Sequence, residues 1–139
     1  MKMAQKKQSI LLAEDDAALQ TALMKALRKE GYHVYGASDG EEALAVFNKR
    51  AFDLVITDLS MPKKKGLEVA AEVKRQKPSI PVIIITAFGD WDTYREAMDA
   101  HVFEYVNKPV KKDEILKLVE TALLYKEKRG VPIGPNGLM

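Results

Sequence analysis

Cysteine is absent from this chain of 139 residues, which excludes disulfides, thiol nucleophiles and zinc sites built on thiolates and suits a reducing compartment. Long apolar runs are absent as well. The basic start MKMAQKKQS is followed by an apolar run only from Ile10 to Ala13, too short for the core of a signal peptide, and no later segment approaches a membrane span. The net charge is only +2, so the chain lacks the strongly basic balance that favours nucleic-acid binding. We therefore expect a cytoplasmic protein that binds neither membranes nor nucleic acid directly.

The composition that is present is typical of a folded globular domain, with 47% hydrophobic and 30% charged residues. The length fits one domain that buries about two-thirds of its unfolded surface. We expect this domain to span residues 8–128. Residues 1–7 are expected to form a disordered N-terminal segment, and the Pro- and Gly-rich residues 129–139 a tail or a linker.

Apolar runs typical of strands alternate with helical patterns along the whole chain. The segments 9–13, 53–57 and 81–86 are continuously apolar, as expected for strands covered on both faces of a parallel sheet. The segments 32–37 and 103–106 alternate instead, which indicates edge strands. Five amphipathic helices separate and follow these strands, so the sequence predicts a single three-layer, doubly wound α/β domain with a five-stranded parallel sheet.

Several residues mark where the helices should start. Asp16 is expected to cap the first helix and Asp90 the fourth, while Gly66 precedes the third. For the second helix, Ser38 and Glu41 have the spacing of a capping box.

Polar residues follow the apolar strands at their carboxyl ends, which meet at one edge of a parallel sheet and form its ligand-binding edge. Crowded carboxylates repel one another unless a cation lies among them, and oxygen ligands of this kind suit Mg²⁺ completed by a phosphate. An aspartate beside Mg²⁺ and a lysine can act as a nucleophile toward phosphoryl groups. The residues expected at this edge are the triplet Glu14, Asp15 and Asp16, then Asp58, Thr86 and Lys108.

The fragments ILLAEDD, DLVITDLSMPKKKG, IIITA and YVNKP resemble, in order and spacing, the receiver domain of two-component response regulators. The resemblance implies a flavodoxin-like fold with strand order 2-1-3-4-5. It implies that Asp58 is the phosphoacceptor and that Thr86 and Lys108 contact the phosphoryl group. It further implies Mg²⁺ held by Glu14, Asp15, Asp58 and the Ser60 carbonyl, and a cis bond between Lys108 and Pro109.

The resemblance also implies partners and a switch. A sensor histidine kinase or a phosphotransfer protein would donate the phosphoryl group, and an output domain or partner protein would respond. The face made by the fourth helix, fifth strand and fifth helix would change through Thr86 and Tyr105, and it is compatible with a homodimer. The domain would catalyse its own phosphorylation and a slow dephosphorylation tuned by Ser60 and Phe88, as a signalling domain and not a metabolic enzyme.

Some residues admit a plainer interpretation. Asp16 could supply part of the acidic pair, although the N-cap is preferred, and Tyr105 could be ordinary strand packing. The run Lys63-Lys64-Lys65 is either a solvated loop or a patch that attracts the phosphodonor. His33 and His101 are expected to be structural. His101 stands where receivers usually carry glycine, so it must adopt a positive φ or the loop must change.

Two enzyme-like alternatives fit the sequence poorly. A haloacid-dehalogenase phosphatase would need a second aspartate two residues after Asp58, where Ser60 stands. A flavin binder would need a phosphate-cradling first loop, which the acidic AEDDAA segment would repel. The remaining alternative is a receiver-like interaction module that no longer uses phosphorylation.

Overall fold

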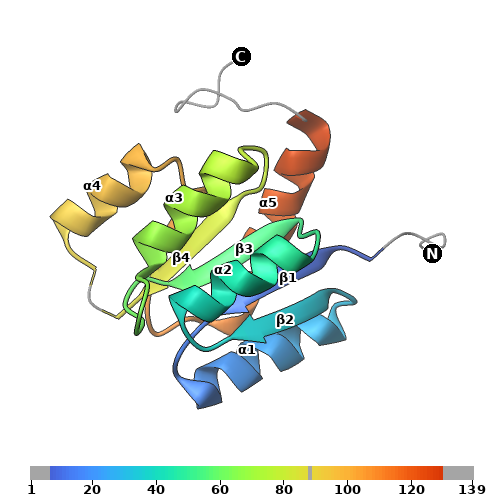
Figure 1. Ribbon diagram of the computed structural model, residues 1–139. Helices are drawn as coiled ribbons and strands as arrows, with labels where there is room; N and C mark the ends of the chain where they lie inside the picture. Colours follow the sequence, from blue (N-terminus) through green and yellow to red (C-terminus); the bar gives the residue numbers. More distant parts are fainter. Residues whose placement is uncertain (1–6, 88, 130–139) are drawn as a thin grey trace.

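The computed structural model describes residues 7–87 and 89–129 (Figure 1). Residues 1–6 of the expected N-terminal segment, Phe88 and the tail from 130 onward lie outside the described residues. The described elements are, in chain order, β1 (Ser9–Ala13), α1 (Ala17–Lys29), β2 (His33–Ala37), α2 (Gly40–Lys49), β3 (Leu54–Asp58), α3 (Gly66–Gln76), β4 (Val82–Thr86), α4 (Trp91–Asp99), β5 (Glu104–Asn107) and α5 (Lys112–Arg129).

The five strands form one parallel sheet in the order β2-β1-β3-β4-β5. This confirms the predicted doubly wound fold, including the placement of β2 and β5 at the two edges. Helices cover both faces of the sheet (Figure 1). Within the described ranges, no helix is both long and apolar enough to cross a membrane.

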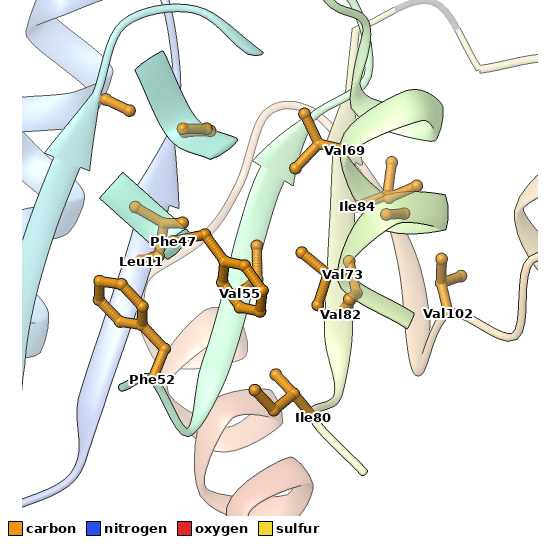
Figure 2. Close-up of a cluster of buried hydrophobic side chains, with 14 of the residues drawn as sticks. Leu11, Phe47, Phe52, Val55, Val69, Val73, Ile80, Val82, Ile84 and Val102 are labelled. Carbon is orange, nitrogen blue, oxygen red and sulfur yellow. The ribbon is translucent and has the colours of Figure 1, made fainter. Parts of the chain in front are cut away.

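The continuous apolar strands supply two separate cores, because successive side chains of a strand point to opposite faces of the sheet. In β1, Leu11 belongs to a buried cluster that includes residues of α2, α3 and α4, whereas Ile10 and Leu12 belong to one that includes residues of α1 and α5. Figure 2 shows the first of these clusters, in which Phe47 of α2 and Val73 of α3 meet the sheet. Each face therefore has its own apolar layer, and the strand ends are left for polar residues.

Aspartates begin three of the helices. The Asp16 carboxylate accepts a hydrogen bond from the Leu19 N–H at 3.1 Å, and Asp90 accepts one from the Thr93 N–H at 2.8 Å, which confirms both predicted caps.

The predicted cap of α2 is wrong by one residue. Asp39, and not Ser38, is the N-cap, accepting from the Glu42 N–H at 2.7 Å, while the Glu42 carboxylate accepts from the Ser38 N–H. Asp39 and Glu42 have the same three-residue spacing as Ser38 and Glu41. The sequence pattern therefore could not distinguish the two registers.

Backbone geometry is unusual at several loop positions. Most of them lie at the carboxyl edge of the sheet, whereas His101, between α4 and β5, lies at the opposite edge. Lys63 and His101 have φ of 70° and 61°, so the loop after α4 keeps a left-handed residue although the chain places histidine there. The Lys108–Pro109 bond is cis, as expected. A Cβ added to Gly66 would lie 2.1 Å from the Asp58 carbonyl oxygen. Only glycine therefore lets α3 start against the backbone that follows β3.

Candidate functional site

Four polar residues from four strand ends converge at the carboxyl edge of the sheet. Glu14 follows β1, Asp58 ends β3, Thr86 ends β4 and Lys108 follows β5. Glu14 and Thr86 are fully buried and Asp58 is 4% exposed, whereas Asp15 is exposed. The expected set is thus brought together, with its acids at different depths.

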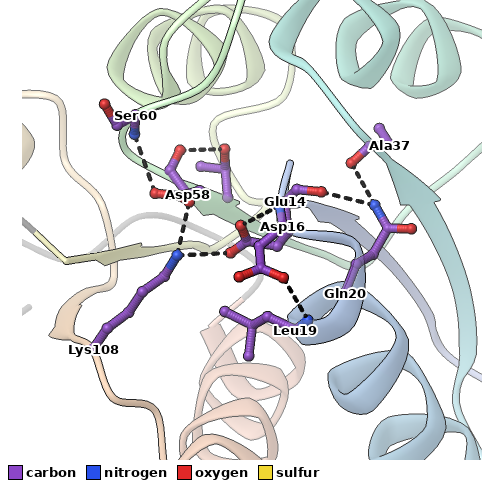
Figure 3. A network of polar contacts seen from close by, with 9 residues as sticks. Glu14, Asp16, Leu19, Gln20, Ala37, Asp58, Ser60 and Lys108 are labelled. Atoms are coloured by element: carbon purple, nitrogen blue, oxygen red, sulfur yellow. Dashed lines mark hydrogen bonds and ion pairs between the residues drawn. The ribbon is translucent and has the colours of Figure 1, made fainter.

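Lys108 joins the two buried carboxylates (Figure 3). Its Nζ lies 2.9 Å from Asp58 Oδ2 and 3.1 Å from Glu14 Oε1. Its backbone N–H donates to the Thr86 carbonyl at 2.7 Å, which fixes the chain from which the side chain extends. Burial opposes its charge, but the two carboxylates outweigh this effect and raise the pKa of Lys108. The ammonium is therefore kept charged between two acids.

Burial disfavours the ionised form of the Glu14 carboxylate. Its pKa is raised to about 7, chiefly by burial and also by the neighbouring Asp58, although the hydrogen bond that Glu14 Oε2 accepts from the Asp16 N–H at 2.9 Å lowers it. Its other oxygen, Oε1, is buried and has no hydrogen-bond partner among the described residues, although it contacts the Lys108 ammonium. A fully buried carboxylate that shares one ammonium group with a second buried acid is costly when ionised, so this position favours an additional cation.

Glu14, Asp15 and Asp58 could supply that cation's ligands. Each contributes one carboxylate oxygen, and these oxygens lie within 4.8 Å of one another. Hard oxygen donors of this kind fit a small divalent cation. The Asp16 carboxylate is engaged by Leu19, which supports its interpretation as a cap.

Ser60 and Gln20 orient the two buried acids through the backbone. The Ser60 N–H donates to Asp58 Oδ1 at 3.1 Å, while the role of its carbonyl as a ligand stays a prediction. The Gln20 side-chain N–H₂ donates to the carbonyls of Glu14 and Ala37, both at 2.9 Å. Gln20 thereby ties together the ends of β1 and β2 beneath the acidic turn (Figure 3). Gln20 was not predicted from the sequence, where its only signal is a polar residue beside the apolar stripe of α1.

Tyr105 lies on β5 at the side of the sheet that faces α4. Its hydroxyl shares a hydrogen bond of 2.8 Å with Thr93 Oγ1, and its ring meets Tyr94 edge-on at 5.5 Å between centroids. Tyr94 in turn stacks on Trp91 at 5.8 Å. Tyr105 thus makes specific contacts with α4 in addition to ordinary strand packing. Thr93 was not predicted from the sequence, because a threonine in a first helical turn usually signals only capping.

The three consecutive lysines form a loop whose backbone is fixed and whose side chains reach solvent. A Cβ on Gly40 would lie 2.0 Å from the Lys64 carbonyl oxygen, so the loop packs on the start of α2. Lys63 Nζ lies 3.7 Å from Asp39, and the Lys65 N–H donates to Glu68 at 3.0 Å. The side chains of Lys63 and Lys65 are exposed, so both interpretations, a solvated loop and a patch that attracts the phosphodonor, stay open.

The raised pKa of Glu14 predicts how stability depends on pH without divalent metal. Because the folded pKa of about 7 exceeds the ordinary value of 4.5, the folded state holds a proton that the unfolded state releases. The contribution of Glu14 to the free energy of unfolding is then greatest below about pH 4.5. It falls by roughly 3 kcal/mol as the pH rises to about 7.

Urea unfolding in EDTA between pH 5 and 8 measures this trend. Glu14→Gln should flatten the fall and be the more stable protein at pH 8. Identical pH profiles for the wild type and Glu14→Gln would contradict the assignment, with Asp15→Asn as the matched exposed control.

Comparisons with known proteins agree with this geometry. Residues 10–120 match the family described as response regulator receiver domain. The chain is 39% identical over 121 residues to the transcriptional regulatory protein GlrR of Escherichia coli, covering 87% of this chain and 27% of that protein. It is 35% identical over 115 residues to the transcriptional regulatory protein PdtaR of Mycobacterium tuberculosis, covering 82% of this chain and 56% of that one. The chain thus spans only about a quarter to a half of these relatives.

Among solved structures, a CheY-like response regulator receiver domain protein from Methanospirillum hungatei superimposes with a TM-score of 0.86. The sequences are 26% identical, and the match covers 88% of this chain and 98% of that one. Fold, family match and relatives agree, and the chain belongs to the response regulator receiver domain family.

Proposed function

We propose that the domain accepts a phosphoryl group on Asp58 from the phosphohistidine of a sensor histidine kinase or a phosphotransfer protein. The observation that carries this proposal is the Lys108 ammonium, which lies between Asp58 and Glu14 at 2.9 and 3.1 Å. A buried carboxylate next to a fixed cation and an incompletely bonded acid is suited to receive a phosphoryl group, because the charges needed to stabilise it are already in place.

In the proposed transfer, a carboxylate oxygen of Asp58 attacks phosphorus while the bond from phosphorus to the donor's imidazole nitrogen breaks, and that nitrogen keeps the electron pair. The Ser60 N–H, which donates to Oδ1, orients the carboxylate. The Lys108 ammonium then contacts a phosphoryl oxygen, which carries the negative charge, and the Thr86 hydroxyl can donate a hydrogen bond to another. Glu14, Asp15, Asp58 and the Ser60 carbonyl would hold Mg²⁺, which supplies positive charge to the phosphoryl oxygens when bound.

The proposed consequence is a change at the face of α4, β5 and α5. Thr86 would move toward the phosphoryl group, and Tyr105 would leave its bond to Thr93 and shift inward. This face would then signal to an output domain or partner protein, and a homodimer through it is compatible with the proposal. The relatives named as transcriptional regulators support a regulatory output. The cytoplasmic location also remains part of the proposal.

The first test is labelling with acetyl phosphate and Mg²⁺, read by intact mass and site mapping. We expect one added phosphoryl group on Asp58, abolished by Asp58→Asn and by EDTA. Asp53→Asn is the matched control, because Asp53 lies just before the opposite end of β3 and binds the Ser9 N–H and Lys126 instead. Labelling that persists in Asp58→Asn, or that needs no divalent ion, would refute the proposal. Absence of labelling in the wild type would favour a module that does not use phosphorylation.

The single tryptophan can report on Tyr105, because Trp91 stacks on Tyr94 and Tyr94 contacts Tyr105. Phosphorylation should therefore change the Trp91 emission of the wild type. Asp58→Asn should abolish the change, and Tyr105→Leu should reduce it by at least half. A full response in the phosphorylated Tyr105→Leu variant would show that Tyr105 does not transmit the change.

The third expectation concerns how long the phosphoryl group stays on Asp58. Ser60 offers only a short side chain beside Asp58, so it should place the hydrolytic water poorly, and we expect slow dephosphorylation. Ser60→Asn should accelerate the decay of phosphorylated protein several-fold, as should Phe88→Glu at the second predicted position. If both variants decay at the wild-type rate or more slowly, neither side chain controls the water.

A further inference from the structure

A pocket of about 530 Å³ lies beside β2, the edge strand next to β1. Its lining includes four residues that carry or can acquire a positive charge: Lys7, Arg28, His33 and Arg50. Tyr32 and Tyr35 add aromatic surface. We call it the basic edge pocket. It shares no residue with the acidic site around Asp58, and the proposed phosphorylation makes no use of it.

Both guanidinium groups of the basic edge pocket are held in place. Arg28 Nη2 donates to the Val34 carbonyl at 2.7 Å. Arg50 Nη1 donates to the Tyr35 hydroxyl at 3.1 Å, and its guanidinium carbon lies 4.3 Å from the centre of the Tyr35 ring. A guanidinium has five N–H donors, so each group keeps donors for a ligand. Because these side chains are already ordered in the free protein, they lose less conformational entropy when a ligand binds.

The positive charge of this pocket is not balanced within it. Among the described residues, no carboxylate lines the pocket, and Lys7, Arg28 and Arg50 make no ion pair. Burial and then the charges of Glu120 and Glu30 raise the pKa of Tyr32, so these two acids act on the phenol from outside the lining. Cations gathered in a concave surface attract an anion.

The edge of β2 is poorly suited to an added peptide strand. His33 donates to Gln8, and the Ala37 carbonyl accepts from Glu14, so the alternate residues Val34 and Gly36 direct their backbone groups to the open edge. The Val34 carbonyl is already taken by Arg28, which removes an acceptor that an added strand would need. A compact ligand fits better, and the volume lies within the range of small-molecule pockets.

We propose that the basic edge pocket binds a phosphate-bearing small molecule through Arg28 and Arg50, with Tyr32 and His33 beside its organic part. Guanidinium forks match phosphate oxygens in geometry and charge. The binding is non-covalent, needs no divalent cation and is independent of Asp58.

The test is an amide NMR titration of the protein in EDTA with pyrophosphate, ADP and adenosine as probes. We expect saturable shifts confined to the lining residues for pyrophosphate and ADP, tighter binding of ADP, and none of adenosine. The double variant Arg28→Gln/Arg50→Gln should weaken binding at least tenfold. Arg50→Lys, which keeps the charge but loses the fork, should weaken it several-fold, and Asp58→Asn should bind as the wild type does.

Lys29→Gln/Lys49→Gln is the matched control. Lys29 and Lys49 are exposed neighbours of Arg28 and Arg50 in the sequence but do not line the pocket, so this variant removes the same charge from outside it. It should bind within twofold of the wild type. Equal weakening in the two double variants would show diffuse attraction only, and shifts centred on Asp58 would place the anion in the acidic site. Either result would overturn the proposal, as would failure of both phosphate probes to bind. Thermal unfolding of each variant verifies that it is folded.

Discussion

The contact of one ammonium group with two buried carboxylates constrains the rest of this site. Glu14 and Asp58 lie at the ends of the neighbouring strands β1 and β3, where both would be costly if ionised alone. Lys108 reaches them from beyond β5 at 3.1 and 2.9 Å. The order of the sheet brings these residues together although Lys108 follows Asp58 by 50 positions. The fold thus maintains a charged cluster that is stable only as a group.

The surrounding backbone is shaped to keep that cluster accessible. Gly66 allows α3 to begin directly against the Asp58 carbonyl, and Gly40 does the same for the lysine loop against α2. Gln20 links the Glu14 and Ala37 carbonyls from α1. These contacts use backbone atoms, so they position the acids without occupying the carboxylate oxygens that a ligand would need. On the other side, the hydroxyl of the half-buried Tyr105 bonds to Thr93 and its ring meets Tyr94 edge-on, and both contacts would change in the movement proposed for it.

The sequence predicted the parts of this arrangement that depend on burial and strand ends. Continuous apolar runs such as Leu54 to Ile56 are expected for strands covered on both faces, and a carboxylate such as Asp58 is then expected where the strand leaves the core. The start of α2 was misplaced because two residue pairs offer the same cap spacing. Gln20 and Thr93 were missed for a different reason. Their partners are 17 and 12 residues away, and a single polar residue carries no pattern that reveals a distant partner.

The most direct measurement of the central claim is a double-mutant cycle of unfolding free energy for Lys108 and Glu14, in EDTA at pH 8. Lys108→Met alone should cost about 2 to 4 kcal/mol, because it leaves two buried carboxylates without their cation. In a Glu14→Gln background the same substitution should cost at least about 1 kcal/mol less, since one of those charges is gone. Equal costs in the two backgrounds, within about 0.4 kcal/mol, would show that Lys108 does not hold the acids together and would contradict the account.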